Sequence, residues 1–318
     1  MPDAPASANA QPTFDPRAIA RMLQRLSAAE QPPWLHGEVA RRMAERLLAI
    51  RQPPATVMQW WGHLGASDAA LRAAYPKARH LVVEPTAALA ARSCKAHAAP
   101  WWTARRWGSP TEVLLEADAA PASAEMLWAN MMLHAVADPP ALLARWRRIV
   151  AAEGFVMFST LGPDTLAELR LLYRELGWPP ATPAFTDMHD LGDMLVQAGF
   201  ADPVMDQERV VLTWATPEAM LMELRGLGSN LHPARFAGLR TPRWRARLLQ
   251  QLRERCSGRD GRLAMGFEVV YGHAFNALPR AKVAPVTTLP VEDLRAMARA
   301  RRRGAAPGDG RPEGCVKL

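Results

Sequence analysis

Apolar and polar residues alternate along the chain with two different periods, which predict helices and strands that follow one another. Apolar side chains recur every three to four positions across residues 33–50, as expected of an amphipathic helix. Short apolar runs at residues 56–60 and 80–84 predict two strands, with a short helix at residues 68–74 between them. Such a succession is typical of a parallel sheet with helices packed on its faces.

The clearest unit spans residues 125–158 and predicts a strand, a loop, a helix and a second strand. The first strand leads to Asn130, and Asp138 is suited to cap the helix, with Pro139 at its first position. Gly154 is predicted to take the left-handed position that ends this helix. Because such crossovers are right-handed and join parallel strands, ligands are expected at the carboxyl ends of these strands.

The later part of the chain predicts further helices and one unusual strand. Helices are expected at residues 166–172 and 188–195, separated by a Gly-Trp-Pro-Pro breaker at residues 177–180. Residues 216–253 predict a helical region that opens on a Thr-Pro pair. Residues 262–275 alternate in polarity and predict a long strand that is antiparallel to its neighbours.

Length and composition limit the class of protein. At 318 residues with 49% hydrophobic residues, the chain can bury a large core as one domain with an insertion. We expect a domain at residues 14–280 with a helical cap at 217–254, a disordered start at 1–13 and a mostly disordered basic tail at 281–318.

Three observations lead us to expect a cytoplasmic protein. No apolar run approaches the ~20 residues needed to span a bilayer, so no membrane segment is expected. The first residues lack a basic and then apolar secretory signal. The three cysteines are scattered without metal-ligand spacing, which favours a reducing compartment and argues against a structural metal.

The first two predicted strands resemble half of a nucleoside site. The first strand is followed by a turn that contains Gly62 and Gly65, and the second strand ends in Glu84, whose carboxylate could accept hydrogen bonds from ribose hydroxyls. The turn does not match the GxGxxG pattern of dinucleotide sites. The alternative is that Glu84 is an ordinary surface acid at a strand end.

Five segments carry a resemblance to a known family. They are LWAN (127–130), FSTLGPDTL (158–166), FTDMHDLGD (185–193), AGFADPVMD (198–206) and FEVVYGHAF (267–275). With them, residues 33–276 resemble the biotin-pathway malonyl-acyl-carrier-protein O-methyltransferases, a branch of the class I S-adenosylmethionine-dependent methyltransferases.

The resemblance implies both a fold and a function. The fold is α/β and Rossmann-like: a mostly parallel seven-stranded sheet with one antiparallel strand, helices on both faces, and a helical insertion before the last strand. The implied enzyme is a carboxyl O-methyltransferase that uses S-adenosylmethionine to methylate the free carboxylate of malonyl-acyl-carrier protein in biotin biosynthesis.

The resemblance also implies the cofactor residues, and here the chain departs from the family. The implied cofactor-binding residues are Gln59, Gly62, Gly65, Glu84 and Asn130. Gln59 stands where the family has an acid, and bulky residues stand where it has glycines. Two of those bulky residues, Trp61 and His63, must turn outward if the backbone is to approach a cofactor.

Two alternatives remain for the residue beside the adenine. The third strand could be Trp101–Trp107, which would leave Ser109 or Glu112 near the adenine. Alternatively, the third strand is at residues 113–115 and Asp118 makes the contact.

Substrate recognition is assigned to a histidine and to a group of arginines. His134, expected at the carboxyl end of a strand, is the candidate catalytic residue that would donate to a carboxylate; the alternative is a rim histidine bonded to a backbone carbonyl. The formal net charge of +8 favours an acidic partner. We expect Arg240, Arg243 and Arg245 to contact an acidic acyl-carrier protein; the alternative is a solvated helix face.

Three functions are compatible with these patterns. The first is the active methyltransferase. The second is a paralogue with weakened or lost cofactor binding that acts as a binding or regulatory protein. The third is a methyltransferase of another substrate, such as RNA, although no RNA-binding motif accompanies the arginines and nucleic acid is not expected as a partner.

Overall fold

The computed structural model describes residues 14–50, 52–98, 111–277 and 291–292. The chain divides into two compact units, residues 1–278 and 279–318, and in the second unit only the helical pair 291–292 is described. Apart from residues 291–292, the ends predicted to be disordered lie outside the described residues, as does the candidate strand Trp101–Trp107 with Ser109.

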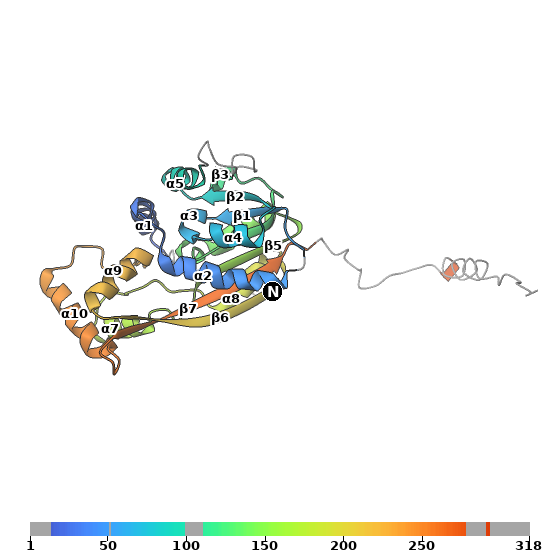
Figure 1. Ribbon diagram of the computed structural model, residues 1–318. Helices are drawn as coiled ribbons and strands as arrows, with labels where there is room; N and C mark the ends of the chain where they lie inside the picture. Colours follow the sequence, from blue (N-terminus) through green and yellow to red (C-terminus); the bar gives the residue numbers. More distant parts are fainter. Residues whose placement is uncertain (1–13, 51, 99–110, 278–290, 293–318) are drawn as a thin grey trace, which may run out of the picture. The chain divides into compact units, whose positions relative to one another are not determined.

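A single seven-stranded sheet forms the centre of this unit (Figure 1). Its strands lie in the order β3-β2-β1-β4-β5-β7-β6. β7 runs antiparallel to both of its neighbours, and the other adjacent pairs are parallel. The predicted mostly parallel sheet with one antiparallel strand is therefore confirmed. The strands are β1 (Thr56–Trp60), β2 (Arg79–Glu84), β3 (Glu112–Leu115), β4 (Ala124–Ala129), β5 (Val150–Leu161), β6 (Ala201–Trp214) and β7 (Leu263–Phe275).

The helices begin where capping side chains and prolines direct them to begin. Asp138 accepts a hydrogen bond from the backbone N–H of Ala141, and Thr216 caps the helix after it in the same way. Both helices have proline at their first turn, as predicted. The α-helices are α1 (Pro16–Ala28), α2 (Trp34–Glu45), α3 (Gly62–Gly65), α4 (Asp68–Ala74), α5 (Ala87–His97), α6 (Pro139–Ile149), α7 (Ala167–Glu175), α8 (Met188–Gln197), α9 (Pro217–Leu227) and α10 (Pro242–Cys256). Short 3-10 turns lie at Arg46–Ala49 (η1), Glu116–Asp118 (η3) and Leu133–Ala135 (η4).

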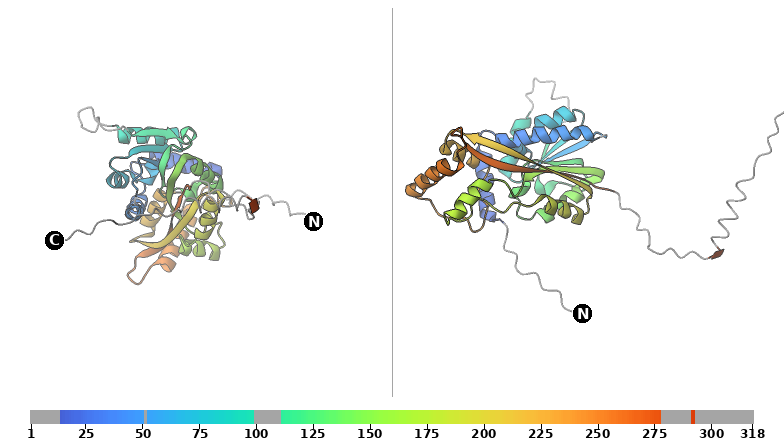
Figure 2. Two further views of the ribbon diagram at one scale, coloured as in Figure 1. Left: turned by 90° about the vertical axis from the view of Figure 1, so that its right-hand side faces the viewer. Right: turned by 90° about the horizontal axis from the view of Figure 1, so that it is seen from below.

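Helices cover the sheet on both faces, and each face has its own core (Figure 2). One apolar cluster joins the sheet to α6 and α8 through residues such as Trp146 and Leu195. The other joins it to α2, α4 and α10 through residues such as Val39, Leu71 and Leu252. The helical region expected at residues 216–253 consists of two helices, α9 and α10, which lie between β6 and β7 in the chain.

The prediction for Gly154 was wrong. α6 ends at Ile149, β5 begins at once at Val150, and Gly154 lies inside that strand. A Cβ there would lie 2.6 Å from the carbonyl oxygen of Glu125 on the neighbouring strand. The glycine is thus explained by close strand contact, and the left-handed residue is its neighbour Glu153, with φ 64°.

β6 was not predicted from the residue pattern. Half-buried and exposed positions largely alternate along this strand. None of its residues is buried, because it is the edge strand beside β7. The sequence AGFADPVMD marks its beginning only through the family resemblance. A polar edge strand has no continuous apolar run by which to recognise it.

Candidate functional site

The carboxyl ends of β1, β2, β4 and β5 meet at one edge of the sheet, where α/β proteins bind ligands. Asn130, directly after β4, lies at the middle of this edge and is buried. Its side-chain amide donates to the backbone carbonyls of His36, at 2.7 Å, and Gly65, at 2.6 Å. Its carbonyl oxygen accepts from the Ser159 hydroxyl. Asn130 therefore ties the loop after β1 to β4 and β5.

The other residues implied for the cofactor lie together at this edge, but several already make hydrogen bonds or close contacts within the protein. Gln59, on β1, is buried and donates to Asp68 at 3.2 Å. Gly62 faces Val82 so closely that an added Cβ would lie 2.8 Å from its side chain. Gly65 has looser surroundings, with a Cβ 3.5 Å from Asn130. These contacts fix the loop after β1 against β2 and β4.

Glu84 ends β2 as predicted, and its carboxylate is fully buried. Its Oε1 accepts from the backbone N–H of His63 at 2.7 Å and from the Ser93 hydroxyl at 2.6 Å. Its Oε2 is buried with no hydrogen-bond partner. Burial raises the pKa of Glu84 to about 7, against the two hydrogen bonds, which favour the charged form. The carboxylate thus keeps one free acceptor.

Trp61 lies directly after β1 with its side chain buried. It has φ 55° and ψ 47°, a left-handed conformation that costs a residue with a side chain about 1–2 kcal/mol. Its indole is 5% exposed, and Nε1 donates to Oε1 of Glu116 at 2.6 Å. The side chain therefore extends from the end of β1 to the turn that follows β3.

Of the two alternatives for the third strand, only the one at residues 113–115 falls within the described residues. β3 is Glu112–Leu115, which agrees with the strand predicted at residues 113–115. Asp118, the acid proposed beside an adenine, is exposed in the following turn. Glu116, two residues earlier, is the acid that faces the loop after β1.

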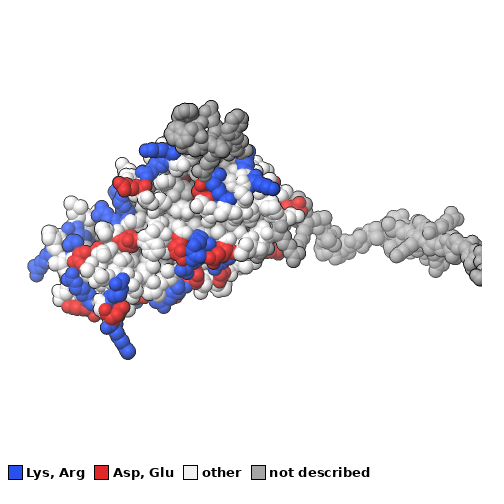
Figure 3. Space-filling model, in the orientation of Figure 1, with Lys and Arg blue, Asp and Glu red and all other residues white. Residues whose placement is uncertain are grey.

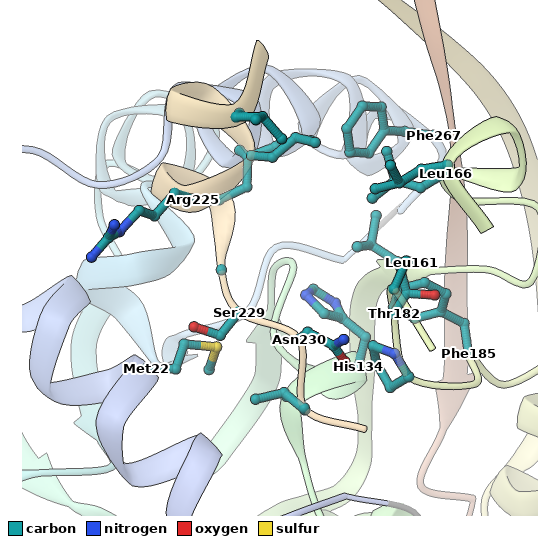
Figure 4. A pocket seen from close by; sticks show the side chains of 18 of the residues that line it. Met22, His134, Leu161, Leu166, Thr182, Phe185, Arg225, Ser229, Asn230 and Phe267 are labelled. Atoms are coloured by element: carbon teal, nitrogen blue, oxygen red, sulfur yellow. The ribbon is translucent and has the colours of Figure 1, made fainter. Parts of the chain in front are cut away.

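A cavity of about 320 Å³ opens beyond β4 and β5 (Figure 4). Met22 and Ser229 lie on one side of it, and Leu161, Leu166 and Phe267 lie on the other (Figure 4). The segment after α7, the start of the loop after α9 and the turn after β4 complete the wall. Most of the lining is apolar, which is typical of a site for a small organic group with a few orienting polar atoms.

Two neutral hydrogen-bonding side chains face this cavity. Burial lowers the pKa of His134 to about 3, and the nearby His36 acts in the same direction, so its imidazole is neutral at physiological pH. Thr160 Oγ1 lies 3.4 Å from Nδ1 of His134. When that nitrogen accepts, the proton is on Nε2 and can be donated to another group. The hydroxyl of Thr182 is buried without a partner.

Arg25 fixes the loop that forms part of the wall. Its guanidinium donates to Ser229 Oγ at 2.9 Å and to the carbonyl oxygen of Gly228 at 2.5 Å. Asn230, which follows Ser229, donates to the carbonyl oxygen of Pro180 at 2.7 Å. This bond joins the loop to the segment that carries Thr182. Arg25, Thr182 and Asn230 were missed by the sequence analysis, because no local pattern distinguishes them from other surface polar residues.

The arginines proposed for the carrier protein lie on and just before α10. Arg240 stacks over the rings of Phe236 and Trp244, with its guanidinium carbon 3.8 and 4.2 Å from their centroids. Arg243 and Arg245 are exposed. On the face shown in Figure 3, basic side chains gather toward α9 and α10, with acidic side chains among them.

The described residues hold no group of three or more His, Cys, Asp or Glu that could bind a metal ion. In that same part of the chain, no helix combines the length and the apolar character needed to cross a bilayer.

Comparisons with known proteins were made for sequence and fold. No family model matches the chain. Malonyl-[acyl-carrier protein] O-methyltransferase from Laribacter hongkongensis is 38% identical over 243 residues, which cover 72% of this chain and 79% of the relative. The enzyme of that name from Gallionella capsiferriformans is 40% identical over 185 residues, which cover 57% of this chain and 63% of the relative. The match thus spans less than two thirds of the length of the Gallionella relative.

A similar structure supports the architecture. A candidate methyltransferase from Bacillus halodurans C-125 superposes with a TM-score of 0.50 at 12% identity, covering 74% of this chain and 98% of that protein. At this identity the likeness concerns the fold alone. It confirms the Rossmann-like class I methyltransferase fold that the sequence resemblance implied.

Proposed function

Because the chain belongs to the malonyl-[acyl-carrier protein] O-methyltransferase family, we propose that it transfers a methyl group from S-adenosylmethionine to the free carboxylate of malonyl-acyl-carrier protein. The observation that carries this proposal is the 38% identity over 79% of the Laribacter relative, combined with the cavity beyond β4 and β5. We further propose that the product serves biotin biosynthesis. The described cysteines, Cys94 and Cys256, are not in disulfides, which is compatible with the reducing cytoplasm proposed for this reaction.

Methyl transfer from S-adenosylmethionine to a carboxylate requires mainly that the protein position the two reactants. S-adenosylmethionine, when bound, supplies a methyl group on a positively charged sulfur. A malonyl carboxylate is already ionised at physiological pH, so its oxygen can attack without a general base. The protein's part is to hold the carboxylate in line and to exclude water. The apolar walls of the cavity suit that exclusion.

His134 and Thr182 suit a carboxylate that must remain nucleophilic. A buried guanidinium would hold the carboxylate in a strong charge-assisted pair and lower the reactivity of its oxygens. The imidazole of His134 is neutral, and the hydroxyl of Thr182 is a neutral donor without a partner. We assign to them the orientation of the malonyl carboxylate, with His134 in contact with the reacting group. Their weaker hydrogen bonds orient the oxygens and leave their electrons available.

At the carboxyl edge of the sheet, some features suit S-adenosylmethionine and others do not. On the favourable side, Glu84 Oε2 is a buried acceptor without a partner, as a ribose hydroxyl would require. We assign Gln59, Gly62, Gly65, Glu84 and Asn130 to this site. On the unfavourable side, the indole of Trp61 lies against the same edge and Glu84 is fully buried. A nucleoside held at this edge would therefore meet the indole of Trp61.

A basic and apolar surface on α10 suits an acidic carrier. Arg240, Arg243 and Arg245 supply positive charge, and Leu239 beside them is 98% exposed. Phe236, which Arg240 covers, is also partly exposed. We propose that an acyl-carrier protein contacts this surface through acidic side chains. Charges at the rim of an interface act mainly on the rate of encounter, so this contact should weaken with salt.

The test is a methyl-transfer assay with labelled S-adenosylmethionine and malonyl-acyl-carrier protein. The native chain should produce labelled methyl ester that is released by base. H134F and T182V should each raise KM or lower kcat about ten-fold or more, which corresponds to loss of one oriented hydrogen bond. T213V, at the far end of β6, serves as the matched control and should transfer at the native rate. Absence of transfer by native protein that binds the carrier would instead favour a binding or regulatory role.

A further inference from the structure

The strand order places Glu84 between two loops that could cover it. β2 lies between β3 and β1, so the carboxyl end of β2 is flanked by the loop after β1 and by the turn after β3. A nucleoside whose ribose is held by the acid at the end of β2 must lie over that strand end, between these two loops. The space over Glu84 is therefore the nucleoside subsite of the proposed function.

The indole of Trp61 bridges this space. Its backbone N–H donates to the carbonyl oxygen of Val83, the residue before Glu84, at 2.7 Å. Its indole Nε1 donates to Glu116, after β3. One side chain thus runs from β1 to β3 across the end of β2. Glu84 is fully buried beside it, with Oε1 bonded to the His63 N–H and to Ser93 of α5.

Further contacts hold the ring in this position. Glu116 Oε2 lies 3.9 Å from the guanidinium of Arg145 on α6. The guanidinium of Arg145 in turn lies over the ring of Trp60, 5.3 Å from its centroid. Trp61 also takes a left-handed backbone conformation that its side chain disfavours. The strain is offset by burial of the indole and by its charge-assisted hydrogen bond.

We propose that the indole of Trp61, tethered by Glu116, closes the nucleoside subsite and must be displaced before S-adenosylmethionine binds. This inference rests on the proposed use of that cofactor. The unpaired Oε2 of Glu84 and the ring that covers the strand end are then explained together. Glu84 is retained for the ribose, and the ring occupies the subsite in its absence.

The experiment measures binding of S-adenosylhomocysteine by isothermal titration, without any turnover. If the ring closes the subsite in about nine of ten molecules, the apparent affinity is reduced about ten-fold. W61G should therefore bind S-adenosylhomocysteine about ten-fold or more tightly than the native chain. W61F keeps a ring but lacks the Nε1 donor to Glu116, so it should also bind more tightly than the native chain, though by less than W61G. E116A, which releases the tether, should also bind more tightly. E112A, at the opposite end of β3, is the matched control and should bind as the native chain does.

Each outcome decides the inference. Tighter binding by W61G, W61F and E116A, with E112A near native, supports it. Equal affinity in native chain and W61G, or binding by neither, overturns it. If W61G does not fold, unchanged affinity in E116A overturns it by itself. Methyl transfer to malonyl-acyl-carrier protein is assayed separately on the native chain. Its failure would refute the proposed function, whatever the affinity of W61G.

Discussion

Glu84→Gln should make the protein more stable at alkaline pH and change little at acid pH. The carboxylate is buried, and burial raises its pKa from 4.5 to about 7. Below pH 4.5 the carboxyl is neutral in both folded and unfolded chains. Between pH 4.5 and 7 the unfolded chain ionises while the folded chain resists, so stability is lost as the pH rises through this window. The amide of Gln stays neutral throughout and avoids that loss.

The size of the effect follows from the size of the pKa change. One pKa unit corresponds to about 1.4 kcal/mol, so a rise from 4.5 to about 7 costs roughly 3 kcal/mol once both states are ionised. Gln can still accept from the His63 N–H and the Ser93 hydroxyl, as Oε1 of Glu84 does. Its amide nitrogen replaces an oxygen that already lacks a partner. The substitution therefore changes charge with little change in hydrogen bonding.

Urea unfolding at several pH values from 4.5 to 8.5, for native chain and E84Q in parallel, measures this difference. The comparison between the two proteins is essential, because the buried His36 and the half-buried His134 have lowered pKa values and make both proteins lose stability as the pH falls below about 6.5. Those contributions cancel in the difference. E112Q removes a formal charge from an exposed position and controls for the change in net charge.

The expected difference in unfolding free energy is near zero at pH 4.5 and rises to about 3 kcal/mol in favour of E84Q above pH 7. A difference that stays constant over this range would refute the reasoning, since it would mean that the folded and unfolded chains ionise Glu84 alike.

Three further outcomes are expected. Asn130→Ala should cost about 3 kcal/mol in a denaturation experiment, because it removes three buried hydrogen bonds at about 1 kcal/mol each. Gly62→Ala should destabilise the protein by about 1–3 kcal/mol, because the added methyl group would collide with Val82 on β2. Gly226→Ala, in open space on α9, should stabilise it by about 0.5 kcal/mol in the same experiment. The reverse order of stabilities would contradict the steric argument. The double charge reversal R243E/R245E should raise the KM for malonyl-acyl-carrier protein and reduce the salt dependence of that KM, while the KM for a small malonyl thioester stays unchanged. A parallel rise in the KM values of both substrates would exclude a carrier contact.

Local sequence determined most of the secondary structure of this protein. The strand Thr56–Trp60 and the helix Asp68–Ala74 have the predicted bounds, and Asp138 and Thr216 cap the helices they were expected to cap. These features depend on side chains that interact with residues a few positions away. The long alternating run at Leu263–Phe275 also predicted its strand, because burial on a sheet has a period of two.

The tertiary structure alone decided which residues meet. Gly154 seemed a helix terminator and is instead a point of close contact with β4, a strand that starts 30 residues earlier. The cavity combines His134, Thr182 and Ser229 from three separate segments. Such contacts join positions that are distant in the chain, and no short window of sequence contains both partners.

Trp61 shows the difference most clearly. The sequence revealed that a bulky residue stands at a position where glycine is expected, and steric reasoning required its side chain to turn away from a bound cofactor. The folded chain buries the indole and pairs it with Glu116, 55 residues later. A buried partner for the indole and removal of its surface from water outweigh the strain of a left-handed backbone. The sequence alone predicts that strain, whereas the compensating contact exists only once β3 is placed beside β2.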